Sequence, residues 1–223
     1  MVIAAGCLTV GLRGNESPLS GPVAQRTPPS TTAAGSTPAV AGGGAPVVAD
    51  TSLSASAPAP APTPTLPAVA ARSAPVSLSI PAIDLVVSVS ALGLNPDRTV
   101  EVPTDFQEPC WFELGPSPGQ LGSAVILGHV DSYEGPAVFF RLRSLQTGDE
   151  IEVSLADGSV VRFAVTTVAT YPKEEFPASQ VYASQGYSAL QLVTCGGAFD
   201  SDARSYLSNV VVYTSLVAIT PAD

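Results

Sequence analysis

Two side chains in this sequence form a combination that can carry nucleophilic chemistry, a thiol and an imidazole. Cys195 ends the apolar run 190–194 and is followed by two glycines, an arrangement that exposes a side chain at a sheet edge. His129, the single histidine, follows a glycine at the end of the apolar run 124–127. A thiolate attacks carbonyl carbon, and an imidazole protonates the group that leaves. The two strand ends therefore predict a cysteine nucleophile assisted by a histidine.

A cationic partner for this pair is scarce in the sequence. Downstream of Cys195, Arg204 is the one positively charged side chain. Acyl transfer from an amide needs donors where the tetrahedral oxyanion develops, and a guanidinium supplies them. Each residue alone has an ordinary interpretation: a cysteine is usually an inert buried residue, a lone histidine a satisfied polar group, and Arg204 a partner of Asp200 or Asp202. Only the combination indicates catalysis.

The elements that must position these residues are predicted to be strands. Alternating or continuous apolar runs indicate strands at 76–80, 83–92, 99–102, 124–127, 150–155, 159–170, 190–194 and 209–219. Asp157–Gly158 is a strong hairpin signal between two of them. The spacing of apolar residues predicts one short helix over 136–145. Because no strand–helix alternation is present, we expect an all-β sandwich or barrel.

Composition divides the 223 residues into three segments. Residues 1–14 form an apolar N-terminal segment, predicted to be the end of a signal anchor; a lipobox at 4–7 with Cys7 as the lipidated residue is the alternative. Residues 15–75 are rich in Pro, Ala and Gly, and residues 1–75 contain no aromatic side chain. Such a segment buries too little apolar surface to offset its ordering entropy, which predicts a disordered stalk. Residues 76–223 are a normal size for one catalytic domain.

Charge and cysteine spacing exclude several classes of partner. Three of the nine Lys/Arg and two of the 19 Asp/Glu lie in 1–75, so residues 76–223 carry a net charge of about −11. This argues against nucleic acid and against charge-driven membrane binding. The three cysteines lack metal-ligand spacing, and Cys110 is predicted to be a buried thiol, with a disulfide to Cys195 as the minor alternative. The adjacent Glu174 and Glu175 read as solvated surface, so we predict neither metal nor cofactor.

Several segments together resemble a known family. They are LGHVDS (127–132), GPAVFFRL (135–142), YPK (171–173), FP (176–177), LVTCGG (192–197) and NVVVY (209–213). These stretches resemble the sortases, and the GHVDS and TCGG segments are similar to the actinobacterial class F type. The resemblance covers about residues 76–217. An apolar anchor, a proline-rich stalk and a catalytic domain also occur in the order that such enzymes use.

The resemblance implies a closed eight-stranded sortase-type β-barrel with one or two short helices. It implies a monomeric, membrane-anchored cysteine transpeptidase on the extracellular face of a Gram-positive cell membrane. Such an enzyme cleaves an LPXTG-like sorting signal after Thr, holds the acyl group as a thioester and passes it to an amine of a cell-wall precursor or surface protein. Carried over, Cys195 is the nucleophile, His129 the general acid/base and Arg204 the oxyanion donor, while Thr194 and Gly196 line the substrate site.

Two features leave other functions open. In many sortases the arginine lies directly before the last strand, where this chain has Leu207, so Arg204 is three residues early. Leu207 favours a catalytically impaired sortase fold that serves as a surface-binding or pilus-associated module. An L,D-transpeptidase is also β-rich with Cys, His and Arg, but its SHGC segment differs from the Val193–Thr194 that precedes Cys195.

Overall fold

The computed structural model describes residues 70–184 and 186–222, so the segment 1–14 and nearly all of the stalk 15–75 lie outside the described residues. The described chain consists mainly of strands. They are β1 (Pro75–Ile80), β2 (Leu85–Ser88), β3 (Ser90–Leu92), β4 (Cys110–Phe112), β5 (Gly122–Leu127), β6 (Asp131–Ser132), β7 (Gly135–Pro136), β8 (Glu150–Leu155), β9 (Val160–Pro172), β10 (Ser188–Asp200) and β11 (Ser205–Thr220). The helix α1 spans Ala178–Tyr182, and short 3₁₀ turns occupy Pro81–Ile83, Leu142–Ser144 and Lys173–Glu175.

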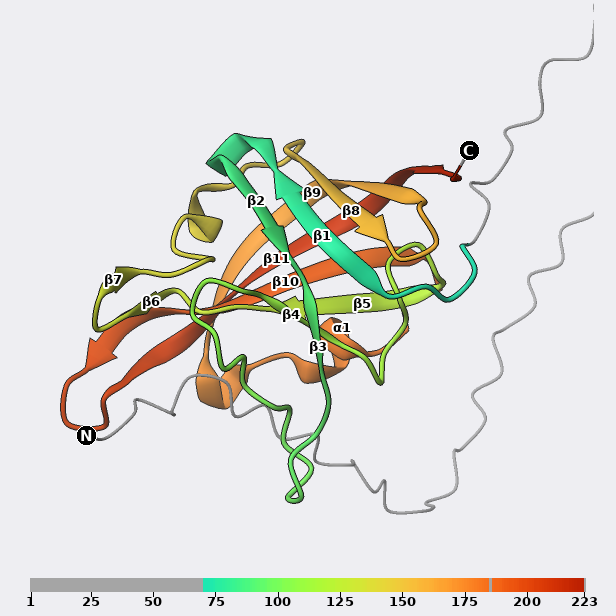
Figure 1. The fold of residues 1–223 in the computed structure, drawn as a ribbon. Coiled ribbons are helices and arrows are strands. Elements are labelled where there is room, and N and C mark those ends of the chain that lie inside the picture. Colours follow the sequence, from blue (N-terminus) through green and yellow to red (C-terminus); the bar gives the residue numbers. More distant parts are fainter. Residues whose placement is uncertain (1–69, 185, 223) are drawn as a thin grey trace, which may run out of the picture. The chain divides into compact units, whose positions relative to one another are not determined.

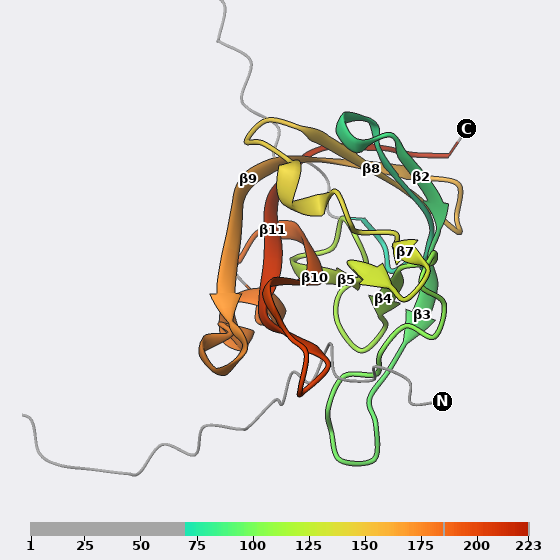
Figure 2. The same cartoon turned by 90° about the vertical axis from the view of Figure 1, so that its left-hand side faces the viewer.

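Nine strands form one curled sheet in the order β2-β1-β8-β9-β11-β10-β5-β4-β3, and β6 and β7 pair separately (Figure 1). Neighbouring strands in the sheet are antiparallel except for two parallel pairs, β5 with β10 and β3 with β4. Viewed along the strands, the sheet wraps around a central core (Figure 2). The all-β class predicted from the sequence is confirmed.

The barrel differs in detail from the closed, eight-stranded form. The sheet has nine strands, and its two edges, β2 and β3, make no ladder with each other in the described part. The predicted strand 83–92 is divided instead: β2 pairs with β1 and β3 pairs with β4. Between them, the Val89 amide donates to the Val76 carbonyl oxygen at 3.1 Å. The chain passes directly from β2 to β3, so the two edge strands are joined covalently although no ladder pairs them.

Local sequence signals predicted some strands well and others poorly. The hairpin at Asp157–Gly158 is confirmed, since β8 pairs with β9 in antiparallel register. The predicted strand 99–102 is wrong, because only a single bridge joins Leu94 to Val100 there. Its backbone is used in a loop, where the Glu101 amide donates to the Gly93 carbonyl oxygen.

The helix predicted over 136–145 is also wrong. The Val138 amide donates to the Phe106 carbonyl oxygen, and the Phe139 amide donates to that of His129. Further along, the amides of Phe140, Leu142 and Ser144 each donate to the carbonyl oxygen three residues back, which makes successive turns instead of an α-helix. Only the 3₁₀ turn Leu142–Ser144 remains, and the apolar spacing of this segment serves loop packing: Val138, Phe139 and Leu142 are buried.

Two clusters of buried apolar side chains occupy opposite faces of the sheet. The larger draws on strands all around the sheet, so its face is the barrel interior; it includes Ile80, Ile126, Val153, Phe163 and Leu192. The smaller draws on one side of the barrel and on α1; it includes Phe112, Leu127, Val181, Val193 and Val211. Because side chains alternate along β10, the odd-numbered positions 193 and 195 face the second cluster. The barrel thus aims Cys195 at its outer, α1-covered face.

Candidate active site

Cys195 lies inside β10, and His129 follows the neighbouring parallel strand β5. The β5–β10 ladder ends with Leu127 opposite Val193, and the Gly128 amide still donates to the Val193 carbonyl oxygen at 3.1 Å. Two residues beyond this last pair lie His129 on one chain segment and Cys195 on the other. The predicted strand end at 194 is wrong, because β10 continues to Asp200 and Cys195 is buried rather than exposed at a sheet edge. Strands are about 4.8 Å apart, which is a distance that the two side chains can bridge. The fold therefore brings together the thiol and the imidazole that the sequence singled out.

The imidazole of His129 is held by the connection between β3 and β4. Its Nε2 lies 2.7 Å from the Pro103 carbonyl oxygen, and its ring centroid lies 4.4 Å from that of Phe106. A carbonyl oxygen only accepts, so Nε2 carries a hydrogen and Nδ1 is the nitrogen left to exchange a proton. With 6% of its surface exposed, His129 is fixed in tautomer and orientation.

Gly128 makes the close packing behind His129 possible. A Cβ at this position would lie 2.6 Å from Cδ2 of Phe139 and 2.9 Å from Cγ1 of Val138. Real side chains do not approach so closely, so glycine is required where the β5 end meets the 138–139 loop. The lack of a side chain at position 128 therefore lets the chain before His129 lie directly against the 138–139 loop.

Cys195 is fully buried and has a polar neighbour across the sheet. In the β10–β11 ladder it is paired with Asn209, and its Sγ lies 3.8 Å from Oδ1 of Asn209. Cys195 is disulfide-bonded in this structure, so its nucleophilic form is the reduced one. Cys110 is free and buried, as predicted, and burial raises the pKa of its thiol. The alternative of a disulfide between Cys110 and Cys195 is therefore not what the structure contains.

Arg204 does not join this pair. It lies in the exposed turn between β10 and β11, with a φ of +50°, and Asp200 opposite Ser205 is the last pair of the hairpin. Five residues of strand separate Cys195 from Asp200, about 16 Å at the usual rise per residue. In the part of the chain that the structure describes, Arg204 also makes no ion pair with Asp200 or Asp202.

The two residues predicted to line the substrate site flank Cys195 differently. Thr194 is 1% exposed and, by alternation, points to the opposite face of β10 from Cys195. Gly196 is buried next to Val210, at the start of an irregularity in the ladder between Gly196 and Phe199. Gly197 has a φ of +77°, which a glycine adopts without strain. The glycines therefore bend the hairpin directly after the nucleophile, and the Thr194 side chain does not reach its face.

A contact that sequence reasoning missed ties the hairpin to the histidine loop. The hydroxyl of Tyr206, on β11, donates to a carboxylate oxygen of Asp131, on β6 two residues after His129. This hydrogen bond raises the pKa of Tyr206 to about 12. Asp131 thus joins β6 to β11. No local signal joins residues 75 positions apart in the chain, so only the fold could show the contact.

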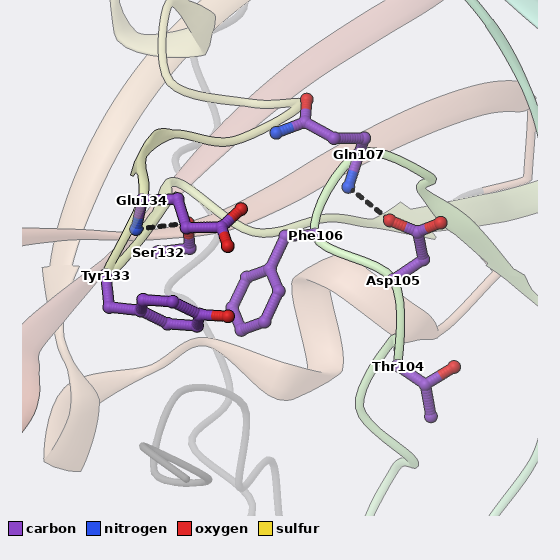
Figure 3. A pocket seen from close by; sticks show the side chains of 7 residues that line it. All are labelled: Thr104, Asp105, Phe106, Gln107, Ser132, Tyr133 and Glu134. Atoms are coloured by element: carbon purple, nitrogen blue, oxygen red, sulfur yellow. Dashed lines mark hydrogen bonds between the residues drawn. The ribbon is translucent and has the colours of Figure 1, made fainter.

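A shallow pocket of about 330 Å³ opens between two loops (Figure 3). One wall comes from the β3–β4 connection and the other from the β6–β7 turn; the lining is Thr104, Asp105, Phe106, Gln107, Ser132, Tyr133 and Glu134. Phe106 is shared, since its ring lines the pocket and also contacts the His129 ring. A hydrogen bond from the Gln107 side chain to the Pro136 carbonyl oxygen at 3.2 Å joins the two walls.

The two adjacent glutamates do not form part of a metal site in the described residues. Glu174 and Glu175 lie exposed in the 3₁₀ turn before α1. Across residues 70–184 and 186–222, no group of three His, Cys, Asp or Glu side chains is placed to hold a metal ion. Within those ranges, too, no helix has the length and hydropathy needed to cross a bilayer.

Sequence comparison identifies the family to which this site belongs. The sortase domain family matches residues 78–217, which covers the barrel and both members of the thiol–imidazole pair. The chain is a member of the sortase family. This excludes the L,D-transpeptidase interpretation. No curated protein matches the sequence significantly.

Solved sortases share the fold of this sortase at low sequence identity. Sortase A from Corynebacterium diphtheriae superposes with a TM-score of 0.52 at 18% identity, over 69% of this chain and 65% of that one. Sortase A from Listeria monocytogenes gives 0.51 at 17%, over 67% and 92%. Streptococcus agalactiae sortase C1, in complex with MTSET, gives 0.51 at 16%, over 67% and 72%. The chain spans 63% of the length of a further match, sortase C1 of GBS pilus island 1.

Proposed function

We propose that this sortase is a cysteine transpeptidase of the actinobacterial class F type that cleaves an LPXTG-like sorting signal after Thr. Cys195 acts as the nucleophile and His129 as the general acid/base. The observation that carries the proposal is that both residues lie two positions beyond the last pair, Leu127 with Val193, of the parallel strands β5 and β10. An imidazole with Nε2 bonded to Pro103 leaves Nδ1 to protonate the departing amine.

The reaction has two halves. In the first, the thiolate attacks the threonine carbonyl, the peptide bond breaks, and the leaving amine takes a proton from His129. In the second, an incoming amine attacks the thioester after losing a proton to the same imidazole, and the thiolate returns. The proposed clients are proteins with sorting signals, and the proposed acceptor is an amine of a cell-wall precursor or surface protein.

The setting of the enzyme is part of the proposal. Sortases are generally associated with the Gram-positive cell surface. We propose that residues 1–14 end a signal anchor and that residues 15–75 form a stalk that carries a monomeric catalytic domain on the outer face of the membrane. The net charge of about −11 over residues 76–223 fits a peptide and amine substrate rather than nucleic acid.

A second candidate is a catalytically impaired sortase fold that binds surface proteins or associates with pili. Leu207 favours it, because an apolar side chain stands where many sortases carry arginine, and Arg204 is at the far end of the hairpin. The presence of both Cys195 and His129 favours the enzyme.

Intact-mass measurement of the full, reduced chain with an LPXTG peptide separates the two candidates. An enzyme gains the mass of the acyl fragment, loses it when an amine is added, and gains nothing as Cys195→Ala. The matched control is Cys110→Ala, which removes the free buried thiol and leaves the adduct intact. If a library of sorting peptides gives no adduct while Cys195 still reacts with iodoacetamide, the binding module is the correct function.

A further inference from the structure

The register of three strands defines what surrounds the nucleophile. Cys195 is paired with Asn209 on β11, and on its other side the chain that leaves β5 carries His129, two residues after the last pair of the β5–β10 ladder. One alternation earlier on the same face, the neighbours are Leu127, Val193 and Val211, all apolar. One alternation later, β11 presents Leu207. Among these registered positions, Asn209 is the one polar side chain besides the imidazole.

Asn209 is built into the sheet rather than lying on a loop. It is 3% exposed, is paired with Cys195 on one side and with Tyr171 of β9 on the other, and its Oδ1 lies 3.8 Å from Sγ. Nδ2, the donor, is bonded to the same amide carbon, so a rotation of the amide group turns it toward the sulfur. Two strands hold the backbone of Asn209, which fixes where its side chain starts, and a fixed position is what an oxyanion donor requires. Arg204, about 16 Å along the hairpin, has no such position.

We propose that the side-chain amide of Asn209 donates the hydrogen bond that stabilises the oxyanion formed during acylation of Cys195. This inference rests on the proposed function. As the Cys195 thiolate attacks, the carbon–sulfur bond forms and the π pair of the carbonyl moves to its oxygen. That oxygen lies between the sulfur-bound carbon and the Asn209 amide, whose Nδ2 donates to it. When the carbonyl re-forms, the carbon–nitrogen bond breaks and His129 supplies the proton to the amine.

A neutral amide explains how the site tolerates Leu207. A hydrogen bond from an amide is roughly half as strong as one from a guanidinium, so acylation is slower but remains supported. The side chain of Leu207 is 50% exposed on the face that also holds Asn209 and Cys195. A guanidinium placed at 207 therefore extends toward the same oxyanion and substitutes for a missing amide.

The test compares two reactions of the reduced, full-length protein. Acylation of Cys195 by p-nitrophenyl acetate passes through an oxyanion, whereas alkylation by iodoacetamide does not. In Asn209→Ala and in the apolar, similarly sized Asn209→Leu, we expect acylation to slow roughly 100-fold while alkylation stays within about twofold of the unmodified protein. Asn209→Ala combined with Leu207→Arg should recover much of the acylation rate. Ser208→Ala, one residue away on the opposite face, is the matched control and should change neither rate.

The experiment distinguishes a failure of the proposed role of Asn209 from a failure of the proposed function. Equal slowing of acylation and alkylation overturns the proposal, because Asn209 then only positions the thiol. An unchanged acylation rate in both Asn209 variants overturns it as well, and circular dichroism identifies any variant that fails to fold. The ester reports on the oxyanion without a sorting peptide. A protein that shows the Asn209 effect with the ester but forms no adduct with any sorting peptide therefore refutes the proposed function alone.

Discussion

The base and the tip of the β10–β11 hairpin differ in what their polar residues do. At the base, Asn209 is buried opposite Cys195, fixed by strands on both sides. At the tip, residues 201–204 are exposed, and the Asp200 carboxylate accepts hydrogen bonds from the Asp202 and Ala203 amides at 2.8 and 2.9 Å. The charged residues of the tip build a turn, while the neutral amide at the base faces the thiol. Nearness in sequence to the nucleophile is therefore a poor guide to catalysis here, and register across strands is a good one.

The largest effect is expected from substitution of His129, which is buried like Asn209. In His129→Gln, the amide retains a donor for the Pro103 carbonyl oxygen but carries no exchangeable proton near neutral pH. We expect the rate of peptide cleavage to fall by roughly 10²- to 10⁴-fold. Stopped assays of sorting-peptide cleavage measure this. A fall of less than about tenfold would mean that another group moves the proton.

The next largest effect is expected at Gly128, where the end of β5 packs against the 138–139 loop. Gly128→Ala puts a methyl group 2.6 Å from the Phe139 ring, so the 138–139 loop or His129 must shift. We expect a cost of about 1–3 kcal/mol in the free energy of unfolding and a drop in activity of roughly 10- to 100-fold. Urea titration and peptide cleavage measure the two. Gly93→Ala, whose methyl would meet only ordinary contacts at 3.7 Å, is the matched control and should lose neither.

A smaller effect is expected at the hydrogen bond between Tyr206 of the β10–β11 hairpin and Asp131 of β6. The bond to Asp131 raises the pKa of Tyr206 to about 12, so the folded state holds this proton above pH 10 while the unfolded state releases it. This contribution to stability is complete below pH 10 and is lost as the pH rises toward 12. Tyr206→Phe should lower the free energy of unfolding by about 1 kcal/mol at pH 8. Urea titrations at pH 8 and 11.5 should show the two proteins converging at the higher pH; a constant difference would contradict the assignment.

The smallest effect is expected at the tip itself. Arg204→Gly removes the guanidinium and relieves a non-glycine residue at a φ of +50°. We expect peptide cleavage within about twofold of the unmodified rate, because one hydrogen-bond donor lost from an oxyanion site would cost about 100-fold or more. A loss of that size would place Arg204 at the oxyanion and erase the contrast between base and tip.

Local patterns in the sequence predicted what local forces determine. The strand 150–155 and the hairpin at Asp157–Gly158 were predicted because alternation and turn chemistry act over a few residues. The helix over 136–145 was wrong because the apolar side chains at helical spacing pack from a series of turns, and local spacing does not distinguish these from a helix. Cys195 and His129 could be singled out by residue type and by the glycines beside them, although the strand end predicted at Cys195 was wrong because β10 continues to Asp200. Asn209 and Tyr206 could not, since their roles come from register and from a contact across 75 residues.

The order of the strands also determines when the sheet can be completed during synthesis of the chain. The last two strands made, β10 and β11, enter the middle of the sheet, between β9 on one side and β5 on the other. Pairings of such long range form late in folding because their loops must close first. A nascent chain that has completed everything up to β9 therefore still lacks the thiol, its amide neighbour and the strand that carries them. The proposed acyl transfer therefore requires β10 and β11 to be inserted, and a chain that stops before β10 lacks the proposed nucleophile.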